Sequence, residues 1–247
     1  SGGVWKTTNH GTTFSPIFDS ENSYSIGCIT IDPKNTNVIW VGSGENNSQR
    51  SVSYGDGVYK SDDGGKSWKN VGLKTSEHIG KIIVDPNNSD IVWVAAQGPL
   101  WKAGGERGLY KTTDGGTNWN VLSQGLPQND MSRIGLAISA TNPNVLYAAY
   151  VNDQLEFDGL YKSINGGTTW NLQASNGIDP NFMGGFGWYF GRIAVNPAND
   201  NQLFICGTDI YKTNDGGMNW MQSDPLYETH ADKHDVFFIN SNTILLA

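Results

Sequence analysis

The chain has 247 residues, a net charge of −8, 31 glycines, and aromatic and charged fractions of 11% and 16%. Its glycine lacks the three-residue period of collagen, its aromatic content excludes a disordered chain, and no apolar run reaches the roughly 18 residues of a membrane helix. No basic stripe marks a nucleic-acid interface. We therefore expect a β-protein with tight turns, no nucleic-acid partner, no membrane insertion and no cofactor.

A sequence motif recurs five times at intervals of about 50 residues, and this repeat governs the interpretation. Each copy joins a Tyr- or Trp-Lys strand to a Gly-containing turn that ends in Trp or Phe. A second motif, an apolar run followed by a polar turn, precedes each later copy. The five copies are Val4–Phe14, Val58–Trp68, Tyr110–Trp119, Tyr161–Trp170 and Tyr211–Trp220.

Each repeat is predicted to form four short strands, because two apolar runs precede a hairpin that closes over the glycines. Four strands in about 50 residues, repeated without helices, are typical of a β-propeller blade. We therefore predict an all-β fold, a β-propeller of four-stranded antiparallel blades. In chain order it comprises an outer half-blade 1–16, full blades at about 24–72, 77–123, 132–174 and 188–222, and an inner half-blade 234–247.

The chain starts at Ser1 and shows no signal peptide, and it ends within a predicted strand. We expect a single propeller region that belongs to a larger propeller. Cys28 and Cys206 lie in apolar runs and are expected to be small buried side chains.

The repeated Ser/Thr-x-Asp/Asn-x-Gly-x-Ser/Thr/Asn-Trp/Phe pattern resembles the Asp-box, or BNR repeat, of sialidases, xyloglucan-cleaving glycoside hydrolases, sortilin and photosystem assembly factors. The stretches 44–60 and 187–191 most resemble bacterial sortilin-like and glycosyl-hydrolase-like repeat proteins. This resemblance implies a secreted, cell-surface or periplasmic protein, with the Asp-box hairpins between the third and fourth strands.

The Asp-box side chains are predicted to be structural, because five copies cannot all form one active site. Their carboxylates or amides are expected to accept backbone N–H bonds, and Trp68, Trp119, Trp170 and Trp220 to cover the hairpins. The five positions are Asn9, Asp63, Asp114, Asn165 and Asp215.

The end of the blades opposite the Asp-boxes is predicted to carry function, because its loops vary in length while the Asp-box end is constant. Trp101 and Trp188 are the tryptophans left outside the repeat, and they are candidates for sugar stacking or for inter-blade packing. His230, Asp232 and His234 alternate, so in an extended chain they would point to one side. A hydrogen-bonded polar cluster is favoured there over a metal site. The full set of candidate ligand-binding residues is Asn46, Arg50, Tyr54, Trp101, Arg107, Trp188, Tyr189, His230, Asp232 and His234.

Glu45 and Asp56 are the candidate catalytic carboxylates, with Glu106, Asp158 and Asp232 as further partners, because glycosidases use a carboxylate pair. The alternative is a polar loop held by its own hydrogen bonds. Sialidase activity is disfavoured, since no nucleophile pair is found, and the catalytic Asp contexts of xyloglucan-cleaving enzymes have no clear match.

Three functions stay open at this stage. The first is a propeller that binds carbohydrate or polypeptide on the face opposite the Asp-boxes. The second is a glycoside hydrolase that uses paired carboxylates on that face. The third is a scaffold or assembly factor in a larger complex.

Overall fold

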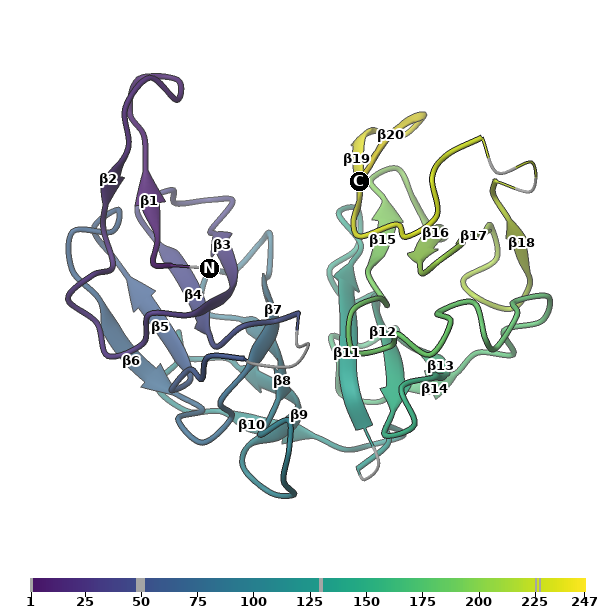
Figure 1. Cartoon of the computed structure of the whole chain (residues 1–247), viewed down its shortest axis with the longest axis horizontal. Coiled ribbons are helices and arrows are strands. Elements are labelled where there is room, and N and C mark those ends of the chain that lie inside the picture. The colour runs from purple at the N-terminus through teal and green to yellow at the C-terminus, as the bar shows by residue number, and fades with distance from the viewer. Residues whose placement is uncertain (1, 48–51, 129–130, 225, 227) are drawn as a thin grey trace. The chain divides into compact units, whose positions relative to one another are not determined.

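The computed structural model describes residues 2–47, 52–128, 131–224, 226 and 228–247. These residues form four four-stranded antiparallel sheets and two two-stranded sheets (Figure 1). The prediction of an all-β fold with four-stranded antiparallel sheets is confirmed. The chain divides into two compact units, unit 1 (Ser1–Val121) and unit 2 (Leu122–Ala247). No helix in the described part of the chain is long and apolar enough to span a membrane.

Unit 1 contains one two-stranded sheet and two four-stranded sheets, and neighbouring strands in each sheet follow one another along the chain. The two-stranded sheet is β1 (Trp5–Lys6) and β2 (Ser15–Pro16). The first four-stranded sheet is β3 (Ile26–Ile31), β4 (Ile39–Ser43), β5 (Val58–Ser61) and β6 (Lys69–Gly72). The second is β7 (Ile79–Val84), β8 (Val92–Gln97), β9 (Arg107–Thr112) and β10 (Asn120–Leu122).

Unit 2 contains two four-stranded sheets followed by a two-stranded sheet. The first is β11 (Met131–Ile138), β12 (Leu146–Asn152), β13 (Phe157–Ser163) and β14 (Asn171–Leu172). The second is β15 (Ile193–Asn196), β16 (Asn199–Cys206), β17 (Ile210–Thr213) and β18 (Trp220–Gln222). The last is β19 (Val236–Asn240) and β20 (Thr243–Leu246).

The hydrophobic cores lie between adjacent sheets, so the second strand of a sheet is covered on both faces. Every residue of β4 and of β8 is buried, which explains their unbroken apolar sequence. Trp40 on β4 packs in one cluster with Ile82 on β7. Cys206 is buried as predicted, whereas Cys28 is only half-buried.

Each repeated turn between the third and fourth strands of a sheet is held by one acidic or amide side chain. Asp63 Oδ1 accepts hydrogen bonds of 2.9 Å from the backbone N–H groups of Lys66 and Ser67. Gly65 has a φ of 87°, which favours glycine. The side chain at the matching position accepts a backbone N–H bond in the other four turns; these residues are Asn9, Asp114, Asn165 and Asp215.

Hydrogen bonds lower the pKa of the three aspartates in these turns. The side-chain and backbone bonds from Asn118 hold the pKa of Asp114 at about 2. The corresponding bonds from Asn219 hold the pKa of Asp215 at about 2, and those from Ser67 lower the pKa of Asp63 further. These carboxylates are therefore ionised and fully engaged in turn structure.

The tryptophans that end the repeated turns differ between the two units. Trp170 and Trp220 donate their indole N–H groups to Gly167 and Gly217 of their own turns. Trp68 and Trp119 instead donate to the carbonyls of Ile17 and Val71, which precede them by about 50 residues. In unit 1 these side chains therefore tie one sheet to the segment before it.

The two turns at one end of each four-stranded sheet are bonded to one another. The Gly64 N–H donates to the Asn37 carbonyl at 2.8 Å, which joins the β5–β6 turn to the β3–β4 turn. The same bond recurs in the other three sheets as Gly115 to Asp90, Gly166 to Asn144 and Gly216 to Asn201. The longer connections, including the β4–β5 and β8–β9 loops, therefore leave from the opposite end of each sheet.

A lysine of the repeat makes the same kind of contact in successive sheets. The Lys60 ammonium lies 5.2 Å from the centre of the Trp40 ring and also approaches the Gly115 carbonyl of the next sheet. Lys6 donates to the Gly64 carbonyl at 2.7 Å. These cations therefore interact within the fold.

Candidate functional site

The β4–β5 loop is held at its base by backbone bonds to two other segments. The Gly44 N–H donates to the Ser25 carbonyl at 2.8 Å, and the Gly55 N–H donates to the Glu77 carbonyl at 2.7 Å. Gly44 has a φ of 87°, and a Cβ there would lie 1.9 Å from the Glu77 oxygen. Glycine is therefore required where this loop passes the connection between β6 and β7.

A buried histidine ties the same loop to the start of β7. His78 is fully buried, and its Nδ1 lies 2.9 Å from the Glu45 carbonyl oxygen. Burial lowers the pKa of His78, although the bond to Glu45 and the charges of Glu77 and Glu45 act in the other direction. The imidazole is therefore neutral near pH 7, with its proton on Nδ1, because a carbonyl oxygen can only accept.

Asn46, a predicted ligand residue, belongs to the buried support of this loop. Its Nδ2 donates to the Gly80 carbonyl at 3.0 Å, and its Oδ1 accepts a 3.2 Å bond from Gln97. The Gln97 N–H in turn donates to the His78 carbonyl. The Asn46 side chain is buried. Asn46 therefore holds the loop in position and is not exposed to a ligand.

An open depression of about 440 Å³ lies beside this loop, and we call it the Tyr54 depression. Lys102 and Glu77 form an ion pair of 2.8 Å across its lining. Tyr54 is 64% exposed. The centre of its ring lies 6.2 Å from the centre of the His78 ring, in an edge-to-face arrangement. The lining residues are Tyr54, Gly55, Lys74, Thr75, Glu77, Pro99, Lys102, Ala103 and Gly105.

The two predicted catalytic carboxylates have different environments. Asp56 Oδ2 accepts a 2.6 Å bond from the Tyr59 hydroxyl, and its Oδ1 accepts from Ser43. The Glu45 carboxylate is half-buried and has no hydrogen bond to a described side chain or backbone group. Glu106, the further partner in unit 1, accepts bonds from the N–H and hydroxyl of Thr75. Glu45 is therefore the one carboxylate of these three that is free for chemistry.

Arg107 and Trp101 take opposite roles in the β8–β9 loop. The Arg107 guanidinium donates to the carbonyls of Pro99 and Lys102, which closes the loop on itself. Burial lowers the pKa of Arg107. Trp101 is 67% exposed and lies next to the lining residue Lys102. Arg50, the remaining candidate in unit 1, lies outside the described residues.

Trp188 and Tyr189 stand in an aromatic cluster in unit 2. Both are half-buried, and their rings lie 5.1 Å apart with an angle of 34° between them. The His234 ring lies 4.5 Å from that of Tyr189 and stacks on that of Phe190 at 5.6 Å. The structure therefore brings three of the predicted ligand residues together, namely Trp188, Tyr189 and His234.

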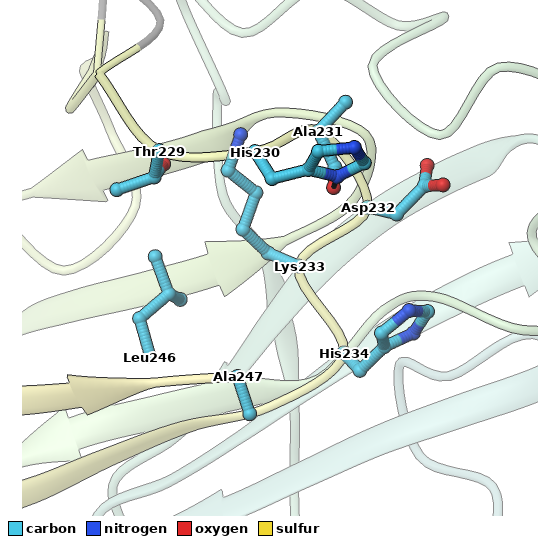
Figure 2. A pocket seen from close by; sticks show the side chains of 8 residues that line it. All are labelled: Thr229, His230, Ala231, Asp232, Lys233, His234, Leu246 and Ala247. Atoms are coloured by element: carbon cyan, nitrogen blue, oxygen red, sulfur yellow. Dashed lines mark hydrogen bonds between the residues drawn. The ribbon is translucent and has the colours of Figure 1, made fainter.

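The segment 229–234 lines a separate pocket of about 390 Å³, together with Leu246 and Ala247 (Figure 2). The segment is not extended at Asp232, which has a φ of 69°. His230 bonds its own neighbour Ala231, and Figure 2 shows its ring apart from that of His234. Within the described ranges, no three His, Cys, Asp or Glu side chains are grouped to hold a metal ion.

Sequence reasoning missed several residues that shape these sites. Lys102 lies in an irregular loop with no repeat position to distinguish it. Arg133 is buried and donates to the Trp188 carbonyl at 2.9 Å, and Lys233 is buried with its ammonium 3.2 Å from the Thr208 carbonyl. The signal available for Arg133 was a charged residue directly before the apolar run that begins at Ile134.

The fold is shared with enzymes of glycoside hydrolase family 74. The GH74 enzyme of Niastella koreensis is 24% identical and superposes with a TM-score of 0.65, over 88% of this chain and 34% of the enzyme. The GH74 xyloglucanase of Xanthomonas campestris is 19% identical, with a TM-score of 0.64 over 89% of this chain and 35% of the enzyme.

A relative found by sequence similarity is also named a xyloglucanase. A xyloglucanase of Paenibacillus is 22% identical over 263 residues, which cover 86% of this chain and 25% of the relative. The chain thus spans about a quarter of that protein's length.

A family model also matches most of the sequence. The model described as "Sortilin, neurotensin receptor 3" matches residues 2–128 and, in a second overlapping placement, residues 56–205. Together with the repeated four-stranded sheets, this match shows that the chain belongs to the sortilin-Vps10 family, among BNR-type repeat proteins related to glycoside hydrolases.

Proposed function

We propose that the chain is part of a secreted or surface-exposed β-propeller that binds carbohydrate at the end of its sheets opposite the Asp-box turns. The four sheets then correspond to blades, and the two-stranded sheets to half-blades of a larger ring. The sheet arrangement supports this proposal, because the paired turns leave the longer loops together at the other end.

The Tyr54 depression is the observation that carries the proposal. It combines an exposed aromatic face with an ion pair and backbone groups, on a loop held rigidly by His78 and Asn46. Aromatic faces pack against the C–H faces of sugar rings, while the polar rim bonds their hydroxyls. The xyloglucanase names of the relatives favour a glycan over other ligands of this chemistry.

Binding is a better proposal than hydrolysis for the described part of unit 1. A glycosidase needs two carboxylates at a defined separation, and Asp56 and Glu106 are already committed to Tyr59 and Thr75. Glu45 alone does not make a pair. A hydrolase in the intact protein would require a second carboxylate from elsewhere.

Calorimetry and affinity electrophoresis with xyloglucan oligosaccharides test the proposal. We expect Tyr54→Ala and Trp101→Ala to weaken binding by between about twofold and tenfold each, the range of an aromatic contact. Phe14→Ala is the matched control, because Phe14 is 56% exposed in a repeated turn.

Two results would contradict the proposal. One is a panel of plant polysaccharides in which none is retained by the wild type; the other is full affinity in Tyr54→Ala. Release of reducing sugar that stops in Glu45→Gln would instead support the hydrolase. Retention of peptides only would favour a polypeptide receptor.

A further inference from the structure

Two asparagines of the chain are each followed by glycine, namely Asn165 before Gly166 and Asn176 before Gly177. In such a pair the backbone nitrogen of the glycine can attack the side-chain amide of the asparagine, because glycine has no Cβ to hinder the approach. The reaction requires that the amide side chain can turn and that the glycine N–H is accessible. The hydrogen bonds around each pair therefore decide which pair reacts.

The first pair is held firmly in one of the repeated turns. Asn165 Oδ1 accepts bonds of 2.9 Å from the Thr169 N–H and 3.0 Å from the Ser163 hydroxyl, and Asn165 Nδ2 donates to the Thr169 hydroxyl at 2.8 Å. Gly166 is buried, and its N–H donates to the Asn144 carbonyl at 2.9 Å. Both reacting groups are therefore engaged, and the folded turn protects this pair.

The second pair lies in the connection between β14 and β15, where both of its residues are exposed. Among the described residues, the Asn176 side chain bonds only Asn219, whose Oδ1 accepts from Asn176 Nδ2 at 3.4 Å. No described residue accepts a hydrogen bond from the Gly177 N–H. Both reacting groups of this pair are therefore accessible to solvent, and the side-chain amide is weakly held.

The fold requires the glycine that follows Asn176. Gly177 has a φ of 82°, and a Cβ there would lie 2.5 Å from the Trp220 carbonyl oxygen. A residue with a side chain would therefore be strained and would also collide with the backbone. The reactive dipeptide arises because this required glycine follows an asparagine.

The same backbone arrangement occurs one sheet earlier with a different side chain. Gly125 has a φ of 81°, and a Cβ there would lie 2.0 Å from the Trp170 carbonyl oxygen. The Gln124 carbonyl accepts the Trp170 N–H at 3.0 Å, just as the Asn176 carbonyl accepts the Trp220 N–H at 2.7 Å. The position before the glycine therefore accommodates glutamine as well as asparagine.

The backbone of Asn176 attaches its connection to the turn between β17 and β18. The Asn176 N–H donates to the Met218 carbonyl at 3.0 Å, and the Trp220 N–H donates to the Asn176 carbonyl. The Ser175 N–H donates to the Gly217 carbonyl at 3.0 Å. A change in the course of the main chain at Asn176 would therefore disturb this attachment.

We propose that Asn176 is a site of spontaneous covalent modification, at which the amide converts to a mixture of aspartate and isoaspartate. The Gly177 nitrogen bonds to Asn176 Cγ, the Cγ–Nδ2 bond breaks, and Nδ2 leaves as ammonia with the proton from Gly177. The product is a cyclic succinimide, which water then opens. Cleavage of the bond from nitrogen to Cγ gives aspartate, and cleavage of the bond from nitrogen to the backbone carbonyl carbon gives isoaspartate.

The two products affect the attachment differently. Aspartate adds a negative charge to a chain of net charge −8 and replaces the Nδ2 donor that bonds Asn219 with an acceptor. Isoaspartate also routes the main chain through the former side chain, which inserts a methylene group before Gly177 and displaces the carbonyl that accepts the Trp220 N–H. Isoaspartate should therefore loosen the connection from the β17–β18 turn. This modification goes beyond the proposed carbohydrate binding and does not depend on it.

Incubation of the folded chain in mildly alkaline buffer, followed by peptide mass spectrometry, tests the proposal. We expect the peptide that contains Asn176 to show the mass of the acid and to accept a methyl group from protein isoaspartyl methyltransferase. Asn165 should react at least about tenfold more slowly, since a local opening of its turn must come first. In a parallel sample unfolded in urea, both asparagines should react at similar rates.

Asn176→Gln is the matched variant, because Gln124 holds the equivalent position. It should melt at the wild-type temperature and stay unmodified, since glutamine would have to close a larger ring. After incubation, the wild type should melt at a lower temperature and exchange the Trp220 amide hydrogen faster, whereas Asn176→Gln should change in neither respect.

Equal reaction of Asn165 and Asn176 in the folded chain would overturn the proposal. An Asn176 that reacts in urea but stays intact in the folded chain would overturn it as well, as would conversion to aspartate without isoaspartate. If Asn176→Gln melts at a lower temperature before incubation, the comparison of folded and urea-treated wild type still decides the outcome.

Discussion

The carboxylate of Asp56 accepts a 2.6 Å hydrogen bond from the Tyr59 hydroxyl, three residues further along the chain. The same aspartate is bonded by Ser43 through both its side chain and its backbone N–H. Burial, together with this hydrogen bond, raises the pKa of Tyr59 to about 12. The pair therefore closes the β4–β5 loop onto β5, which identifies Asp56 as a structural residue.

Removal of the Tyr59 hydroxyl should lower stability without removing ligand binding. We expect Tyr59→Phe to reduce the free energy of unfolding by about 1 kcal/mol, the usual contribution of one such hydrogen bond. Tyr161→Phe is the control, because Tyr161 holds the same repeat position and its hydroxyl has no hydrogen bond to a described residue. Urea titration of both variants gives the comparison, and equal losses would contradict the assignment.

The aspartates of the repeated turns should make stability depend on pH in acid. The pKa of Asp114 is about 2 in the folded chain against an ordinary value of 3.8. The folded state therefore binds fewer protons, and the stabilisation present above pH 4 should be lost as the pH falls toward 2.

Asp114→Asn should make the melting temperature depend less on pH between pH 5 and pH 2. The fold should be preserved, because Asn165 makes the equivalent bonds in its own turn. Melting temperatures measured between pH 5 and pH 2 for the variant and the wild type test this expectation. An unchanged slope in the variant would show that the charge of Asp114 is not coupled to folding.

Protonation of His78 should destabilise the β4–β5 loop at mildly acidic pH. Burial depresses its pKa in the folded state, so the unfolded or locally opened state binds the extra proton below the ordinary value of 6.5. Stability rises with pH in that window and is lost as the pH falls through it. Hydrogen exchange at the Gly55 amide, which bonds Glu77, should quicken relative to the intrinsic rate between pH 7.5 and pH 5.5. In His78→Gln this pH dependence should disappear.

Alanine substitutions at two glycines distinguish the cost of backbone strain from the cost of a steric clash. Gly44 and Gly104 have φ values of 87° and 89°, but a Cβ at Gly104 would meet nothing within 4 Å. Gly104→Ala should therefore cost about 1 kcal/mol from the left-handed backbone alone. Gly44→Ala should cost clearly more, because it also displaces the Glu77 carbonyl. Chemical denaturation ranks the two, and a smaller loss in Gly44→Ala would contradict the close approach.

Local chemistry explains what could be predicted from the sequence. The hydrogen bonds that the backbone N–H groups of Lys66 and Ser67 donate to Asp63 span three or four residues, so the repeated spacing alone indicates a turn. The strands around Trp40 and Trp93 were likewise predicted from their apolar runs. Such features depend on neighbours in the chain, and these are visible without coordinates.

The candidate sites depend on contacts between distant segments, and these were predicted poorly. Asn46 was assigned to a ligand, yet it bonds Gly80 and Gln97 on strands that only the folded sheet brings near. The convergence of Asp232 with His230 and His234 depends on an extended backbone, and no sequence signal indicates the positive φ of Asp232. Trp188 and His234 were proposed individually, but their common neighbour Tyr189 connects them only in space.

The lysines of the first two repeats, Lys6 and Lys60, indicate how the number of repeats in such a chain could change. Lys6 and Lys60 each reach a glycine carbonyl in the turn of the following sheet, so the attachment between neighbours is carried by the repeat itself. In an array stabilised by nearest-neighbour contacts, a duplicated or deleted repeat brings or removes its own attachment. A repeat added or lost beside these two junctions would therefore leave the remaining attachment intact, while the loops at the other end of the sheets are not involved in it.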